Sequence, residues 1–332
     1  MNWRCRCRVW LLGLALGLLG VVVGAAEAPK NILCTTFPVY QFTRAVAAGR
    51  EGGGGTVSLM LPAGLGCPHD YVLTPQDMAK VSGADILVVN GLGLEEFLGA
   101  PVQRANGRLR TVDSTAGIPD LLEFTGDENA EHHGGHGEEN DNDSDNDNGH
   151  GHDCEHEHVG VNPHLFASPR MAAKMVMNIA VGLAAADPAG AALYTANAKA
   201  YAKRLETLSA EFVAAGKTLR NNRIVTQHGV FDYLARDMGI DIVAVVQAHA
   251  GQEPAAAEML SIIKTIRATK AGAIFTEPQY PERIAQTLAK ETGIATAMID
   301  PVASGPDDAN PDYYETVMRQ NLATLQRVLG EK

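Results

Sequence analysis

The sequence is poor in cysteine, in aromatic residues and in positive charge. Of its 332 residues, 5 are cysteine and 5% are aromatic, and 27 Lys and Arg stand against 39 Asp and Glu, giving a formal net charge of −12. A protein that binds nucleic acid needs a basic face, so we do not expect this class. The sequence also lacks an HExxH motif, a paired carboxylate motif and a nucleophile elbow, which argues against an enzyme.

An uncharged apolar run stands at the amino terminus. Three arginines precede this run, Val9–Val23, and small residues follow it up to Ala26. This order is typical of a secretory signal peptide. The run has 15 residues, fewer than the roughly 20 that a membrane-spanning helix needs. We therefore expect residues 1–26 to be a cleaved signal peptide and the rest to be periplasmic. An uncleaved anchor is the alternative.

Short β-branched or apolar runs alternate with helical patterns along the rest of the chain. Eight runs predict strands: Asn31–Thr36, Thr56–Met60, Asp85–Val89, Leu109–Val112, Arg223–Thr226, Asp241–Val246, Gly272–Thr276 and Ala295–Ile299. Helices are predicted between them at Thr74–Val81, Ala255–Thr269 and Pro281–Glu291. This alternation predicts an α/β protein. Because four strands precede the middle and four follow it, we expect two lobes, each a small mostly parallel sheet flanked by helices.

A long helical pattern separates the two sets of strands. Apolar residues recur at helical spacing from Ala191 to Ala215, and neither Gly nor Pro interrupts them. One long, rigid helix is therefore expected to join the lobes and to limit their relative motion. The predicted organisation is an N-terminal lobe at 27–190, a linking helix at 191–217 and a C-terminal lobe at 218–332.

Residues 126–160 differ from the rest of the N-terminal lobe. Twelve Asp or Glu and no Lys or Arg lie within residues 127–158, so the remainder of the chain sums to zero charge. So few apolar residues predict a disordered loop. Seven histidines lie in it: His132, His133, His136, His150, His152, His156 and His158. We expect these to form weak accessory metal sites; a solvated acidic tether is the alternative.

Outside this loop, three histidines and one aspartate occupy informative positions. His69 and His228 follow predicted strands, His164 follows the loop, and Asp300 follows the last strand. Ligands of open α/β sheets bind at the carboxyl ends of the strands. Three imidazoles and one carboxylate suit a tetrahedral Zn²⁺ site between the lobes. Taken singly, each histidine is as well explained by a structural role, and Asp300 before proline by a turn.

Several blocks in this order resemble the zinc- and manganese-binding proteins of bacterial ABC importers, a family that includes the high-affinity zinc uptake proteins. The blocks are FPVYQFTRAVA, GCPHDYVLTPQDMAKVSGADILVVNGLGLEEFL, NPHLFASP, QHGVFDYLARDMGI, GQEPAAAEMLSIIKTI and FTEPQYPERIAQTLAKETGI followed by IDP. The resemblance implies capture of Zn²⁺ as a transported ligand and its delivery to a membrane permease with a cytoplasmic ATPase. The expected protein is a monomer and not an enzyme.

The resemblance also implies the ligands. By position, His69, His164 and His228 match the metal-binding histidines, and Asp300 matches the fourth ligand of many members. Some zinc members use a Glu directly before the first His, but Pro68 stands there, which leaves Asp300 or a water. Uptake of Mn²⁺ or Fe²⁺ is the alternative within the class. A metal-dependent adhesin and a zinc hydrolase are alternatives outside it.

The cysteines depart from the family pattern, because no Cys follows Cys154 and the late disulfide of some zinc members therefore has no counterpart. Cys34, Cys67 and Cys154 follow the signal segment, and an odd number cannot pair completely in an oxidising compartment. Cys67 stands two residues before His69, where a thiolate can in principle reach Zn²⁺. A structural role for Cys67, or a disulfide with Cys34, is the favoured interpretation.

Overall fold

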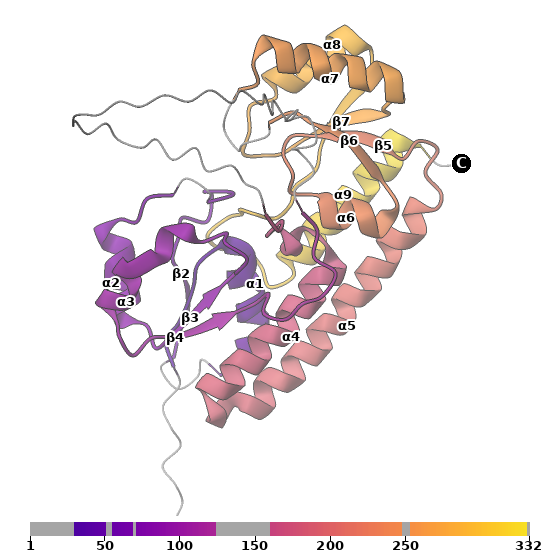
Figure 1. The fold of residues 1–332 in the computed structure, drawn as a ribbon. Coiled ribbons are helices and arrows are strands. Elements are labelled where there is room, and N and C mark those ends of the chain that lie inside the picture. The colour runs from indigo at the N-terminus through magenta and orange to yellow at the C-terminus, as the bar shows by residue number, and fades with distance from the viewer. Residues whose placement is uncertain (1–29, 51–54, 69–70, 124–159, 248–252, 331–332) are drawn as a thin grey trace, which may run out of the picture.

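The computed structural model describes residues 30–50, 55–68, 71–123, 160–247 and 253–330. The predicted signal peptide and nearly all of the predicted acidic loop lie outside these ranges. Within them, no helix combines the length and apolarity that a membrane span requires. The described chain forms two lobes, which lie at opposite ends of a long helical pair (Figure 1).

The N-terminal lobe is built on a four-stranded parallel sheet. Its strands are β1 (Ile32–Cys34), β2 (Val57–Leu59), β3 (Ile86–Val89) and β4 (Arg110–Asp113). Their order across the sheet is β2-β1-β3-β4, and every neighbouring pair is parallel. The chain therefore reverses its winding direction between β1 and β3, and ligand sites of such sheets lie where the strand order reverses.

The C-terminal lobe repeats this topology. Its strands are β5 (Arg223–Thr226), β6 (Asp241–Val245), β7 (Ala273–Thr276) and β8 (Ala295–Met298). They are ordered β6-β5-β7-β8, again all parallel. All eight predicted strands are present, and the predicted two-lobed α/β architecture is confirmed.

Helices cover both faces of each sheet. Around the first sheet lie α1 (Phe37–Ala47), α2 (Pro75–Gly83) and α3 (Gly99–Ala105), and around the second lie α6 (Asp232–Met238), α7 (Ala256–Thr269) and α8 (Arg283–Thr292). The remaining helices are α4 (Pro169–Ala186), α5 (Ala191–Gly216) and α9 (Tyr313–Leu329), with short 3₁₀ turns at Glu96–Leu98, Leu165–Ala167 and Pro188–Gly190. The four predicted helices correspond to α2, α5, α7 and α8, so these predictions are confirmed.

The two sheets share one hydrophobic core. Successive strand residues point to opposite faces: in β1, Ile32 packs into the shared cluster while Leu33 faces a separate cluster under α2 and α3. In β7, Phe275 joins the shared cluster while Ile274 packs under α7 and α8. One face of each sheet thus packs on a common layer that contains α1, α4, α5, α6 and α9. The lobes are separate sheets on a continuous core.

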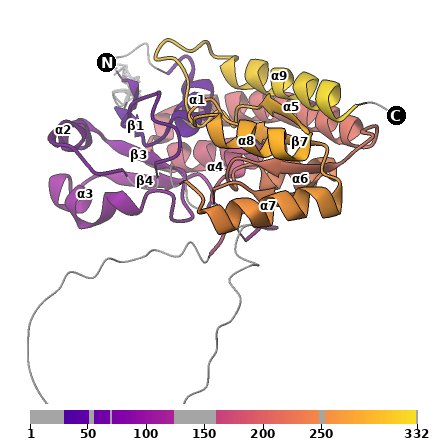
Figure 2. The same cartoon turned by 90° about the horizontal axis from the view of Figure 1, so that it is seen from above.

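The long helix α5 runs through this common layer and packs against α4 over much of its length (Figures 1 and 2). It also contacts α1 of the first lobe and α6 of the second. The C-terminal helix α9 crosses back to α1, where the rings of Tyr314 and Phe42 lie 5.1 Å apart. Relative motion of the lobes would have to disturb this buried layer, because packed cores resist continuous deformation.

The junction between α5 and the C-terminal lobe leaves no room for a side chain at Gly216. A Cβ atom there would collide with the backbone carbonyl of Met238, at the end of α6. We expect Gly216→Ala to lower the free energy of unfolding by about 1–3 kcal/mol, as overpacking does. Gly83→Ala is the matched control, because nothing lies within 4 Å of its added methyl group. Urea unfolding of both variants measures the difference, and equal stabilities would contradict this account of the junction.

Candidate metal centre

Three polar side chains extend from the carboxyl ends of strands in the C-terminal lobe. His228 stands two residues after β5, Glu277 directly after β7, and Asp300 two residues after β8. Because β5 and β7 are neighbours in a parallel sheet, their carboxyl ends lie together and bring His228 and Glu277 into contact. Parallel strands therefore explain how residues 49 positions apart meet.

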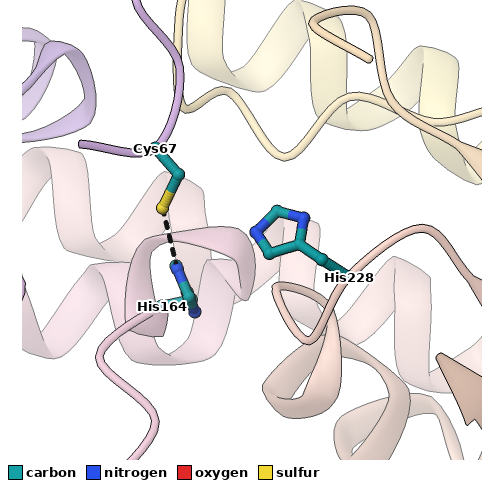
Figure 3. Close-up of side chains that lie close together, drawn as sticks. All are labelled: Cys67, His164 and His228. Atoms are coloured by element: carbon teal, nitrogen blue, oxygen red, sulfur yellow. Dashed lines mark hydrogen bonds between the residues drawn. The ribbon is translucent and has the colours of Figure 1, made fainter. Parts of the chain in front are cut away.

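Three side chains converge between the lobes and form the candidate metal centre: Cys67, His164 and His228. Among the described residues, one ligand atom from each lies within 4.8 Å of the others. The Cys67 Sγ is 2.9 Å from His164 Nε2, and the rings of the two histidines are 5.5 Å apart and nearly perpendicular. Figure 3 shows the three side chains directed toward a common point. Cys67 and His164 precede the linking helix and His228 follows it, so both halves of the chain contribute.

The imidazole of His228 is held by a buried carboxylate. Its Nδ1 lies 2.7 Å from Glu277 Oε1, and the two residues are 4% and 1% exposed. A neutral imidazole that donates its Nδ1 hydrogen to a carboxylate presents a lone pair at Nε2. The Nε2 of His228 is buried and has no hydrogen-bond partner among the described residues. A buried, unpartnered nitrogen costs free energy unless a ligand occupies it.

The imidazole of His164 is held by an amide. Its Nδ1 lies 2.8 Å from Oδ1 of Asn162, which also accepts from the backbone N–H of His164 at 3.0 Å. An amide oxygen can only accept, so the hydrogen is on Nδ1 and the Nε2 lone pair faces Cys67. The Cys67 thiol then donates to that nitrogen. Both histidines therefore direct Nε2 toward the same point.

The segment that carries His164 is bonded to both lobes. Asn162 Nδ2 donates to the backbone oxygen of Gly229 at 2.7 Å and to Asp232 Oδ2 at 2.8 Å. From the other side, Asn90, which follows β3, donates through Nδ2 to the backbone oxygen of Pro163 at 2.9 Å. These bonds fix the backbone before His164 against each sheet, and hence fix the position of its ring.

Carboxylates surround the centre from both lobes. Burial, followed by the charges of Glu277 and Glu95, raises the pKa of the Cys67 thiol well above its usual value. Glu95 is buried and accepts from Thr35 Oγ1 and the Asn90 N–H, both at 2.6 Å. Burial raises the pKa of Glu95 despite these bonds. Anionic groups in a low-dielectric site favour a bound cation.

Asp300 lies near the centre but outside the group of three. Burial, and more weakly the charge of Glu277, raises its pKa to about 6, while the N–H of Val302 donates to its Oδ1 at 2.8 Å and opposes this shift. The backbone of Asp300 is fixed by two hydrogen bonds with the Asn321 amide. Asp300 is therefore close enough to Glu277 to respond to its charge but does not join the three convergent side chains, and its ligand role stays a prediction.

Several predicted residues fall outside the described ranges. These are His69, which directly follows Pro68, and the seven histidines of the predicted loop. The sequence left open whether Cys67 has a structural role or forms a disulfide with Cys34, and the structure contains both residues as free thiols. Cys34 is a core residue of β1, where burial raises its pKa to about 12, whereas Cys67 turns toward His164.

Comparison with known proteins identifies related sequences along nearly the whole described chain. Residues 32–328 match the family described as "Zinc-uptake complex component A periplasmic". The zinc-binding lipoprotein AdcA of Streptococcus pneumoniae is 29% identical over 310 residues, which cover 92% of this chain and 57% of AdcA. The high-affinity zinc uptake system protein ZnuA of Bacillus subtilis is 29% identical over 300 residues, covering 89% and 86%. The chain thus spans little more than half the length of AdcA.

Solved structures share the fold. Zn(II)-bound AdcA of S. pneumoniae has a TM-score of 0.69 and 26% identity, covering 92% of this chain and 59% of AdcA. FpvC of Pseudomonas aeruginosa, solved with Ni²⁺, has a TM-score of 0.72 and 27% identity, covering 92% and 99%. The laminin binding protein Lmb of Streptococcus agalactiae has a TM-score of 0.70 and 22% identity, covering 91% of this chain and 100% of Lmb. At this identity the likeness is one of fold alone.

Glu277 provides a test of the geometry at this centre. Glu277→Gln keeps the shape of the side chain but removes the charge that holds His228, so we expect zinc affinity to fall by about 10–100-fold. Competition with a chromophoric chelator measures the change. Glu253→Gln is the matched control, because Glu253 is an exposed partner of Arg283 on the surface. Equal affinities of the two variants would show that Glu277 does not support a ligand.

Proposed function

Because the chain belongs to the family of periplasmic zinc-uptake complex components, we propose that it captures Zn²⁺ between its lobes and delivers it to the permease of an ABC importer. One observation supports this proposal above the others. Two buried imidazoles from opposite halves of the chain have Nδ1 engaged by Asn162 and Glu277, and both direct Nε2 to one point. Zinc-ligating histidines commonly have this arrangement, with the second nitrogen bonded to a carboxylate or carbonyl.

The proposed histidine ligands are His69, His164 and His228, with Asp300 or a water completing the set. Imidazole nitrogens suit Zn²⁺ better than they suit Mn²⁺, which prefers carboxylate, carbonyl and water oxygens. The carboxylates of Glu277 and Glu95 already accept hydrogen bonds from His228 and from the backbone around Asn90. Uptake of Mn²⁺ or Fe²⁺ is therefore the less favoured alternative.

Transport rather than catalysis is the role that the surroundings support. A zinc hydrolase needs a general base that can reach the metal-bound water and is not itself a ligand. Glu277 is engaged with His228, and both oxygens of Glu95 accept hydrogen bonds. We propose that the mature chain acts as a periplasmic monomer, after removal of residues 1–26, and that its partners are the permease and its ATPase.

The predicted loop at residues 126–160, called the histidine-rich segment below, is proposed to collect Zn²⁺ near the centre. The residues that flank it, Glu123 and Val161, pair in an antiparallel bridge. Val161 is followed directly by Asn162, which holds His164. The segment therefore leaves and rejoins the fold beside a proposed ligand, so any zinc bound by its seven histidines is kept at high local concentration near the transport site.

Removal of one ligand tests the transport site. We expect His164→Ala and His228→Ala each to abolish the single tight Zn²⁺ site in calorimetric titrations, while weaker binding by the histidine-rich segment persists. The reason is that each variant leaves the opposing imidazole without its partner across the lobes. Wild-type protein titrated with Mn²⁺ should bind more weakly. Tight zinc binding in both variants would exclude this centre as the capture site.

Deletion of residues 127–158 tests the accessory role separately. We expect the variant to keep the tight site, because Glu123 and Val161 can still pair, and to lose the weaker sites. Calorimetric stoichiometry measures both. Loss of the tight site on deletion would mean that the segment, rather than His164 and His228, holds the transported ion.

A further inference from the structure

We propose that Cys67 supplies a thiolate ligand to the bound metal and takes the coordination position otherwise expected for Asp300. This inference rests on the proposed capture of Zn²⁺ at the same centre and specifies one of its donor atoms. It makes the centre a mixed nitrogen and sulfur site.

The positions of the donor atoms carry the inference. Zn–S and Zn–N bonds of about 2.3 and 2.0 Å place a sulfur and a nitrogen roughly 3.5 Å apart on a tetrahedral ion. The Cys67 Sγ and His164 Nε2 lie 2.9 Å apart, and His228 offers its atom within 4.8 Å of both. Small side-chain rotations therefore convert the group into three ligands of one ion.

A second observation points to a ligand at the same place. His228 is 4% exposed, yet its Nε2 has no hydrogen-bond partner among the described residues, and it faces the space beside Cys67 and His164 (Figure 3). Buried nitrogens are rarely left unpaired. An ion bound by the three side chains would satisfy it.

The backbone of Cys67 is held in position by the second lobe. The preceding residues pack against it: the N–H of Gly305 donates to the backbone oxygen of Ala63 at 3.0 Å. Gly66 has a positive φ of 80°, and an added Cβ there would lie 3.0 Å from Gln279 Cγ. Glycine at this position thus permits the turn and the close contact that direct Cys67 inward.

Asp300 is less well placed for the same role. Its Oδ1 accepts from the Val302 N–H at 2.8 Å, and its backbone is fixed to Asn321. Among the described residues it does not join the group whose ligand atoms converge within 4.8 Å. Metal binding therefore needs a larger movement of Asp300 than of Cys67.

A thiolate changes the chemistry of capture. On binding, the Cys67 thiol loses its proton to solvent and the sulfur lone pair forms the metal bond, so one proton is released for each ion bound. Sulfur ligands favour Zn²⁺ and softer ions, whereas Mn²⁺ prefers oxygen. Cys67 is thereby assigned as a determinant of metal specificity.

X-ray absorption at the zinc edge tests the assignment on the full mature chain loaded with one equivalent of Zn²⁺. We expect one sulfur scatterer at about 2.3 Å beside nitrogen scatterers near 2.0 Å. The sulfur should vanish in Cys67→Ser and remain in Cys34→Ser and Cys154→Ser, which are the matched thiol controls. A wild-type spectrum without sulfur, or one whose sulfur survives Cys67→Ser, overturns the proposal.

Affinity measurements separate this inference from the proposed function. Cys67→Ser should lower the affinity for zinc by about 10–100-fold or more. Loss of an outer-shell partner already costs about this much, and Cys67 is proposed to bind the metal directly. Cys67→Asp, which replaces sulfur by oxygen, should lower the ratio of the zinc affinity to the manganese affinity. If tight zinc binding is unaffected by either change and needs His164, only the role of Cys67 fails. If wild-type protein has no tight zinc site, the capture function itself fails.

Discussion

Burial of polar side chains at the junction of the lobes is the constraint on which the rest of the structure depends. A buried donor or acceptor without a partner costs about 1–3 kcal/mol, so the chain segments that meet there must satisfy one another. Asn162 does this most fully: its oxygen holds both the N–H and the ring of His164, and its nitrogen bonds to Gly229 and Asp232. The backbone before His164 therefore cannot shift without breaking bonds to both lobes.

The continuous core explains why the side chains at this junction can be held at defined distances from one another. Both sheets pack one face on the same helical layer, and α9 returns to α1 through Tyr314. The sequence predicts the strands and the long helix well, because alternation of apolar runs is a local signal. It did not predict the shared core: contacts such as that of the Tyr314 hydroxyl with the Phe166 carbonyl join residues 148 positions apart, and no local pattern records them.

The centre could be predicted only in part, for a similar reason. His164 and His228 were identifiable because they follow the loop and a strand, and strand ends gather at one edge of a parallel sheet. The position of Cys67 beside His164 could not be predicted, because the two residues are 97 positions apart and no local pattern records their contact. Asn162 was missed altogether, although the NPH triplet places its side chain within reach of the histidine two residues later.

The bridge between Glu123 and Val161 closes the fold at the base of the histidine-rich segment. Because those two residues are neighbours in space, the length of chain between them is not dictated by the rest of the architecture. Natural selection can therefore lengthen, shorten or rewrite this stretch without repositioning His164. The same place is suited to domain insertion, where a fluorescent reporter would lie near the proposed metal centre.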